Sequence, residues 1–213
     1  MSNFPVILSA PSGGGKTTIA RTLLARRPDL GYSVSCTTRS PRAGEVNGRD
    51  YYFLSRREFI DRQGHGDFAE SAEVHGNLYG TLQAEVDRVL QAGKHVIMDI
   101  DVQGALQFRR VFPQSVTVFV LPPSGEVLLQ RLRERDTESG AQMVARLHSA
   151  LQELQAVDEY QYVVVNDDLG TAVDLVSSII DAEVASRDRV ANLRHQVTQL
   201  IDRLEREIEN HSL

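Results

Sequence analysis

Short apolar runs alternate with stretches of helical periodicity along most of the chain. The runs lie at residues 6–8, 95–99, 116–120 and 162–165, and they are short enough to be buried strands rather than helices. The helical stretches that follow the later runs lie near 104–111, 124–134 and 141–157. This alternation predicts a doubly wound parallel α/β sheet of about five strands with right-handed crossovers.

The stretch at 34–94 interrupts this alternation. A helix end at 26–31 and a second strand at 32–35 lead into it, and residues 36–48 are polar. Short extended segments and two short helices then follow, the second with Leu82, Val86 and Val89 on one face. We therefore expect a small mixed α+β insertion here.

The end of the chain, 188–213, forms a predicted helical extension. Apolar residues recur there at three- and four-residue steps, close to a coiled-coil seam of about three heptads. They are Val190, Leu193, Val197, Leu200, Leu204 and Ile208. The seam is either a contact between copies in a homo-oligomer or a helix packed on its own domain.

A glycine-rich turn joins the first apolar run to the first helical stretch. Its glycines allow successive N–H groups to turn inward around a phosphate, and the following helix adds its positive end. Lys16 would reach the β- and γ-phosphates, and the Thr17 hydroxyl would ligate Mg²⁺. Ala10 stands where the motif G-x-x-x-x-G-K-[ST] has its first glycine, a change of one methyl group.

This turn predicts a nucleoside triphosphate site without defining the reaction, and the alternative is a flexible turn that happens to precede a lysine. The predicted ATP-binding residues of the turn are Ala10, Pro11, Ser12, Gly13, Gly14, Gly15, Lys16, Thr17 and Thr18.

Composition and charge narrow the class of protein. The 213 residues, 41% of them hydrophobic, are enough for one well-buried core with small inserted subdomains. A net charge of −6 argues against general affinity for nucleic acid or an anionic membrane. A single cysteine, Cys36, excludes an internal disulfide framework, and no stretch resembles an export signal or a membrane span. We expect a cytoplasmic protein.

Two acidic residues follow the apolar run at 95–99. Asp99 falls at the predicted carboxyl end of the strand, where open α/β sheets bind ligands, and Asp101 is two residues further. Carboxylates there can hold Mg²⁺ through water. The alternatives are surface acids or a helix cap, and Asp101 is placed to cap a helix that starts near Gly104.

The insertion carries side chains suited to an anionic ligand. Arg39 and Arg42, three residues apart around a proline, suit a phosphate dianion, and the hydroxyls of Tyr51 and Tyr79 could supplement them. The alternative is a charged, solvated loop.

A glutamate of the insertion has the chemistry to read a base. Glu70 alternates with apolar neighbours, and a carboxylate accepts both N–H groups of the guanine edge but is refused by adenine. Ser35 and Thr81 could add hydroxyls. From spacing alone, a surface glutamate is the commoner case.

Several of these motifs, taken in order, resemble the guanylate kinase family over roughly residues 4–185. The blocks that carry the resemblance follow the glycine turn in the family's order and are 33–45, 48–51, 76–81, 99–104 and 165–169. Cys36, where a serine is common, and a less acidic segment at 135–140 depart from the family pattern.

The resemblance implies a nucleoside monophosphate kinase that uses ATP and Mg²⁺ to phosphorylate GMP, and dGMP, in purine nucleotide metabolism. Its core would comprise 1–33, 95–130 and 147–187, with a GMP-binding insertion at 34–94 and a mobile lid at 131–146. By the same resemblance Asn166 lies beside adenine and Asp99 near both metal and base.

The resemblance also implies roles for two further sets of residues. The catalytic charges would be Lys16, Arg39, Arg131, Arg135 and Arg146. The GMP-binding residues would be Ser35, Arg39, Arg42, Tyr51, Glu70, Tyr79, Gly80, Thr81, Asp99 and Asp101.

Three other interpretations share parts of the pattern. A related class of enzymes phosphorylates ribose 1,5-bisphosphate, but Glu70 and Thr81 speak against it. Guanylate-kinase-like interaction modules tend to lack a working phosphate loop, whereas Gly15-Lys16-Thr17 is intact here. The third is a nucleotide-binding scaffold that assembles through its C-terminal helix.

Overall fold

The computed structural model describes residues 3–74, 76–134 and 140–211. By internal packing the chain divides into a larger unit, Asn3–Ser177, and a smaller one that contains the segment from Ser178 onward.

The larger unit is built on a parallel sheet. Among the described residues, five strands form it in the order β2-β7-β1-β8-β9, every neighbouring pair parallel. Their bounds are β1 Pro5–Ser9, β2 Leu30–Tyr32, β7 His95–Asp99, β8 Val116–Leu121 and β9 Tyr162–Val165. The predicted doubly wound sheet is confirmed, with β1 central and fully buried.

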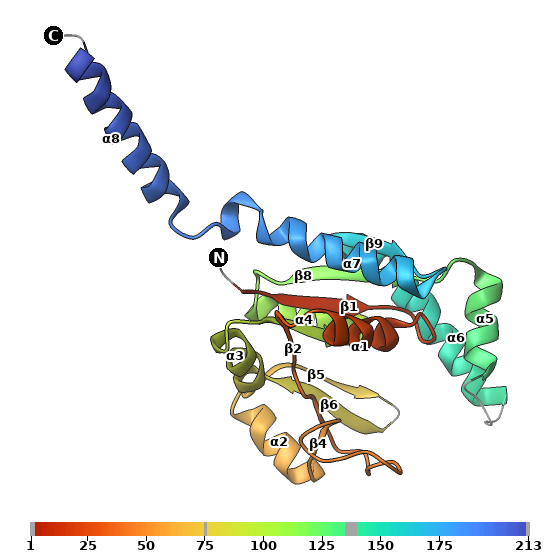
Figure 1. The fold of residues 1–213 in the computed structure, drawn as a ribbon. Coiled ribbons are helices and arrows are strands. Elements are labelled where there is room, and N and C mark those ends of the chain that lie inside the picture. Colours follow the sequence, from red (N-terminus) through yellow and green to blue (C-terminus); the bar gives the residue numbers. More distant parts are fainter. Residues whose placement is uncertain (1–2, 75, 135–139, 212–213) are drawn as a thin grey trace. The chain divides into compact units, whose positions relative to one another are not determined.

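Helices lie between the parallel strands along the chain, and one more follows the last strand (Figure 1). The helix after β1, α1, packs on β1 and β7, while α4 packs on β1 and also reaches the second sheet. Their bounds are α1 Lys16–Arg26, α4 Val102–Val111, α5 Gly125–Glu134, α6 Gly140–Gln155 and α7 Leu169–Val184. The carboxyl ends of β1 and β7 lie side by side, with Leu8 in register with Asp99.

A second, mixed sheet occupies the stretch predicted as an insertion. Its described strands follow the order β4-β3-β6-β5, with β3 parallel to β4 and antiparallel to β6. Their bounds, with those of the two helices beside them, are β3 Cys36–Thr37, β4 Tyr52–Phe53, α2 Arg56–Gly64, β5 Phe68–Val74, β6 Asn77–Leu82 and α3 Gln83–Gln91.

The two sheets share one hydrophobic cluster. Ile7 of β1, Ala69 of β5, Val89 of α3 and Phe108 of α4 all belong to it, and Phe108 is fully buried. Burial of apolar surface is the main favourable term in folding, so this cluster fixes β5 relative to the parallel sheet. The boundaries of the insertion at 34 and 94 stay predictions.

The helix end predicted at 26–31 is confirmed, because α1 ends at Arg26, and Gly31 at the end of this stretch is part of β2. A Cβ atom at this position would collide with Val89 Cγ1 of α3, so only glycine lets the helix approach the strand this closely. The strand therefore lies at Leu30–Tyr32, earlier than the predicted 32–35.

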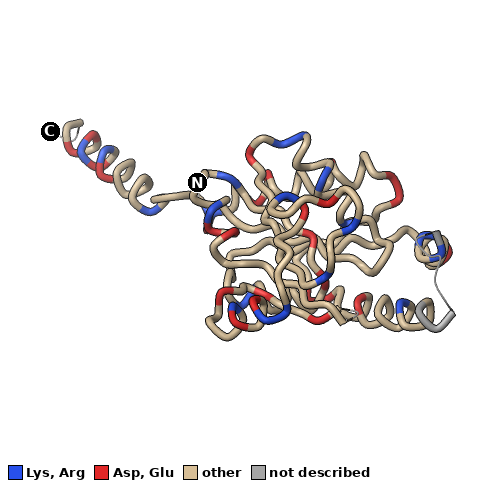
Figure 2. Tube along the Cα trace, turned by 90° about the horizontal axis from the view of Figure 1, so that it is seen from below, with Lys and Arg blue, Asp and Glu red and all other residues tan. Residues whose placement is uncertain are grey.

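The C-terminal unit contains the end of α7, a short turn of 3₁₀ helix at Arg187–Arg189 and the predicted helix α8, Leu193–His211. No residue of α8 is buried, and its charged residues of both signs alternate along it (Figure 2). The exposed apolar residues of α8 are Val197, Leu200, Ile201, Leu204 and Ile208. Within the described residues, no helix combines the length and the apolar character needed to cross a membrane.

Candidate active site

A cavity of about 820 Å³ opens at the carboxyl edge of the parallel sheet. Its walls come from the loop at 11–17, the end of β7, the second sheet and α6. The predicted site residues that line it are Pro11, Ser12, Gly13, Gly14, Gly15, Lys16, Thr17, Ser35, Tyr51, Glu70, Tyr79, Gly80, Asp99, Asp101 and Arg146. Residues far apart in the sequence thus meet around one space.

The loop between β1 and α1 has the backbone of a phosphate-binding turn. Gly13 and Gly15 have positive φ angles of 85° and 95°, a region that favours glycine. A Cβ atom on Gly14 would lie 2.5 Å from Cβ of Ala10, so these two positions together tolerate one methyl group. Ala10 is accommodated because its partner is glycine.

The side chain of Asn166 is hydrogen-bonded to this loop. It follows β9, is 6% exposed, and donates from Nδ2 to Gly14 O at 2.9 Å. A Cβ atom on Gly15 would collide with the same amide nitrogen. The contact that the structure gives Asn166 is with the loop, and its place beside adenine stays a prediction.

Asp99 connects three elements at the end of β7. Its Oδ2 accepts from Thr17 Oγ1 at 2.5 Å, and its Oδ1 accepts from Tyr32 OH at 3.1 Å. Burial and the Asp99 charge together raise the pKa of Tyr32. Two oxygen ligands, a hydroxyl and a carboxylate, therefore lie together at the start of α1, a donor set suited to a hard cation.

Asp101 is the N-cap of α4. Its Oδ1 accepts from Gly104 N at 2.7 Å, which satisfies one of the amides left open at a helix start. The alternative that Asp101 caps a helix is thus confirmed, and the helix begins at Val102. The same carboxylate lines the cavity.

Glu70 points into the molecule, so the surface alternative is wrong. It is 7% exposed, and its Oε1 accepts from Thr81 Oγ1 at 2.7 Å across the β5–β6 pair. A Cβ atom at Gly104 would lie 2.8 Å from Glu70 Oε2, so glycine at this position lets the carboxylate lie against α4. Burial, aided by the charge of Asp101, raises the pKa of Glu70 to about 7, although the Thr81 hydrogen bond opposes the rise.

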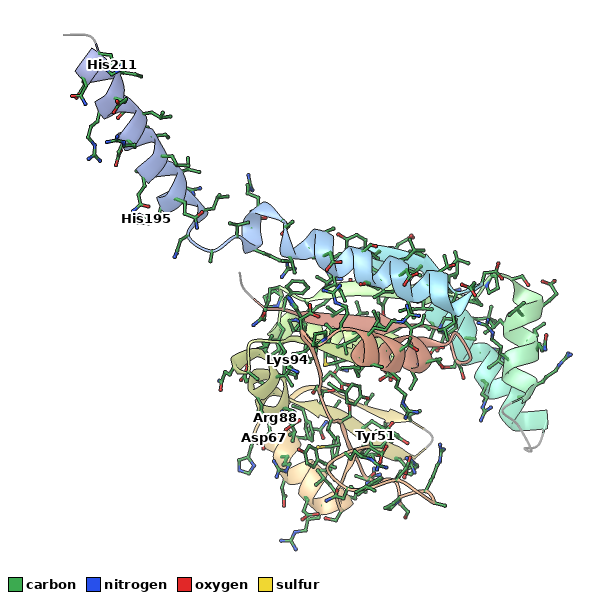
Figure 3. All side chains as sticks on the ribbon, viewed as in Figure 1. Tyr51, Asp67, Arg88, Lys94, His195 and His211 are labelled. Atoms are coloured by element: carbon green, nitrogen blue, oxygen red, sulfur yellow. The ribbon has the colours of Figure 1, made fainter. Side chains whose placement is uncertain are left out.

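The two predicted phosphate-binding tyrosines line the cavity, whereas one arginine of the insertion is ion-paired and the other is exposed. Tyr51, labelled in Figure 3, and Tyr79 line the cavity with their rings 6.1 Å apart. Arg39 stacks over Tyr51 at 5.5 Å, but its Nη2 forms an ion pair with Glu45 at 2.8 Å. This hydrogen bond holds the pKa of Glu45 below its usual range. Arg39 is thus paired with Glu45 in this structure, and Arg42 is exposed.

Two of the three predicted lid arginines lie within the described residues. Arg131 of α5 packs against Gly13 and donates from Nη2 to Asn166 O at 3.2 Å, while its buried Nη1 meets no hydrogen-bond partner among the described residues. Arg146 of α6 lines the cavity. Arg135 lies outside the described residues.

Two residues at the site were not predicted from the sequence. Tyr32 bonds Asp99, and Glu153 lines the cavity and accepts from Ser12 N at 3.1 Å. Glu153 lies seven residues after Arg146, which puts both on one face of a helix, so helical spacing was the available signal.

The fold and the loop define a P-loop nucleotide-binding protein, with a strand, a glycine turn and a helix in the order that this motif requires. A family model described as "Guanylate kinase" matches residues 2–183. The chain belongs to the guanylate kinase family, as its motifs predict.

Relatives and a solved structure agree with this assignment. The chain is 49% identical to the guanylate kinase of Desulfitobacterium hafniense (strain Y51) over 84% of its own length and 89% of the relative's. It is 46% identical to the guanylate kinase of Nitrosomonas europaea, covering 91% and 94%. The crystal structure of guanylate kinase from Anaplasma phagocytophilum superposes with a TM-score of 0.75 at 34% identity, covering 91% and 93%.

We predict that Glu70 makes the stability of the protein depend on pH. The carboxyl has a pKa of about 7 when folded and an ordinary value of 4.5, so the folded state holds the proton more tightly. The contribution of Glu70 to the free energy of unfolding is then fully present below about pH 4.5. It falls by about 3 kcal/mol as pH rises through 7.

Glu70→Gln removes this loss. The variant should match wild type at pH 4.5 and exceed its free energy of unfolding at pH 8 by about 1–3 kcal/mol, measured by urea denaturation. Glu73→Gln, an exposed change in the same strand, is the control and should shift stability by less than about 0.5 kcal/mol. A Glu70→Gln variant no more stable than wild type at pH 8 would contradict the prediction.

Proposed function

We propose that the protein transfers the γ-phosphoryl group of ATP to GMP, and to dGMP, giving ADP and the corresponding diphosphate. One observation carries the proposal. A single cavity contains Lys16 on a phosphate-binding loop and, on its other wall, the buried carboxylate of Glu70. The first suits a triphosphate donor and the second a guanine base. The membership of the guanylate kinase family supports this pairing.

The acceptor side would work by hydrogen bonding. Ionised Glu70 accepts from N1–H and N2–H of guanine, while Ser35, Thr81 and Asp101 support the base. Adenine presents an acceptor at N1 and leaves Glu70 unpaired. Neither Glu70 nor Thr81 is assigned to the ribose 2′-OH, so we expect dGMP to be an acceptor as well.

The remaining acceptor contacts would hold the GMP phosphate. They are Arg39, Arg42, Tyr51, Tyr79 and Gly80.

The transfer step would be an in-line attack of a GMP phosphate oxygen on the γ-phosphorus, with the bond to the β,γ-bridging oxygen breaking and ADP leaving. The attacking oxygen is already anionic, so no strong general base is needed, and positioning and charge stabilisation dominate. The stabilising charges would be Lys16, Arg39, Arg131, Arg135 and Arg146.

Thr17 and Asp99 would hold Mg²⁺, Asp99 through water. Their oxygens lie 2.5 Å apart at the cavity wall, a fit for an ion that keeps water and phosphate oxygens as its other ligands. Bound there, Mg²⁺ neutralises charge on the triphosphate. Thr17 Oγ1 would ligate the ion through a lone pair while its O–H still donates to Asp99.

We also propose how the chain divides this work. The core at 1–33, 95–130 and 147–187 would bind ATP, the insertion at 34–94 would bind GMP, and 131–146 would act as the lid. The single cysteine, Cys36, is buried and free, which fits a reducing cytoplasm. The phosphorylation of GMP would place the protein in purine nucleotide metabolism.

A coupled assay of ADP release tests the proposal. With ATP and Mg²⁺, we expect release with GMP and dGMP, and rates lower by about three orders of magnitude or more with AMP, CMP, UMP and ribose 1,5-bisphosphate. Glu70→Gln should raise KM for GMP far more than KM for ATP. Equal rates with AMP, ribose 1,5-bisphosphate or no acceptor would refute the assignment.

The apolar stripe of α8 supports a second proposal, that two copies of the chain associate through this helix. The exposed residues Val197, Leu200, Leu204 and Ile208 recur with coiled-coil spacing, and an identical stripe on a second copy complements it. Arg203 and Glu207 form an ion pair of 3.3 Å along the same helix.

Light scattering after gel filtration tests the association. We expect wild type to run as a dimer or larger assembly at micromolar concentration, and Leu200→Glu/Leu204→Glu to run as a monomer. Thr198→Glu, outside the stripe, should behave as wild type. A monomeric wild type would contradict the proposal, and deletion after residue 187 shows whether activity needs the helix.

A further inference from the structure

The phosphate-binding loop already contacts an anionic group in this structure. Glu153 of α6 accepts a hydrogen bond from Ser12 N at 3.1 Å, across 141 positions of sequence. Both residues line the cavity, and so does Arg146 on the same helix. The contact therefore lies inside the proposed ATP site.

The electrostatics of Glu153 tie it to the cavity. Desolvation, with a contribution from Asp101, raises the pKa of its carboxyl, while the hydrogen bond from Ser12 and the positive charge of Lys16 act in the opposite direction. The carboxylate thus interacts with the lysine assigned to the triphosphate.

A backbone N–H offers one donor. While the Ser12 amide bonds Glu153, it is not available to an oxygen of a bound phosphate. An incoming polyphosphate would also bring negative charge to a loop that already has a carboxylate beside it, and like charges at short range repel most strongly where water is partly excluded.

We propose that Glu153 is a positioning residue that occupies the Ser12 amide before nucleotide binds and is displaced by the phosphates of ATP. It thereby lowers the affinity of the loop for ATP and links the filling of the loop to α6, the helix that carries Arg146. This inference rests on the proposed function, because it takes the loop as the ATP site.

The effect on ATP affinity distinguishes a Glu153 that ATP displaces from one that only shapes the loop. A ligand shifts an equilibrium only by its differential interaction with the two states, so weakening the Glu153 contact should strengthen ATP binding. If Glu153 only held the loop in shape, the same change would weaken ATP binding or leave it unaltered.

Calorimetric titration of the full chain with ATP and Mg²⁺, without GMP, tests the inference. Glu153→Gln keeps the size of the side chain and a carbonyl acceptor but removes the charge, and we expect it to bind ATP roughly three- to tenfold more tightly than wild type. Glu153→Ala, which also removes the acceptor, should bind ATP at least as tightly as Glu153→Gln. The gain should be smaller for ADP, which brings less charge.

Asp158→Asn is the matched control. It removes a carboxylate that is exposed just after α6, and it should bind ATP as wild type does. Wild type that binds ATP, together with Glu153 variants that bind it no more tightly, overturns this inference alone. Wild type that binds no ATP overturns the proposed function as well.

Discussion

The glycine turn between β1 and α1 is the constraint on which the site depends. Gly14 packs against Ala10, Gly15 leaves room for the amide of Asn166, and that amide holds the Gly14 carbonyl. The turn lies at the end of the central strand, β1, and Asn166 reaches it from the end of β9. Through Thr17, Asp99 at the end of β7 is bonded to the start of α1. Residues at the ends of two other strands thus hold the turn and the helix that follows it.

The side of the cavity that we propose reads guanine is fixed by packing rather than by the loop. Ala69 shares a buried cluster with Ile7 and Phe108, so Glu70, the next residue, is held relative to the parallel sheet. Gly104 leaves space for the Glu70 carboxylate beside α4. A carboxyl kept in such a position titrates near neutral pH, and an ionised guanine-binding form has to be favoured by the donors of the base. Stability and recognition therefore compete at this residue.

Much of this arrangement follows from the order of residues. Periodicity alone predicts the parallel sheet, and the glycine turn with its lysine predicts a phosphate site, because both signals are local. The alternation of Glu70 with apolar neighbours allows an inward direction without requiring it. The particular acceptor came from motifs in family order, since spacing alone left Glu70 as a surface residue.

What the sequence could not predict depends on contacts between distant segments. The stretch 26–31 predicts the end of α1 but not that Gly31 belongs to β2, where its missing side chain lets Val89 of α3 approach. The ion pair of Arg39 with Glu45 and the hydrogen bond of Glu153 with Ser12 leave no pattern in their own stretches of chain. Such contacts arise only when tertiary packing has placed the partners.

The account makes the glycine loop the donor half of a two-nucleotide site, and Lys16→Met tests that claim most directly. Steady-state turnover with ATP and GMP, together with direct binding of GMP, separates the donor half from the acceptor half. We predict that turnover falls by orders of magnitude while GMP affinity stays close to wild type. Equal turnover in the variant and wild type would contradict the account.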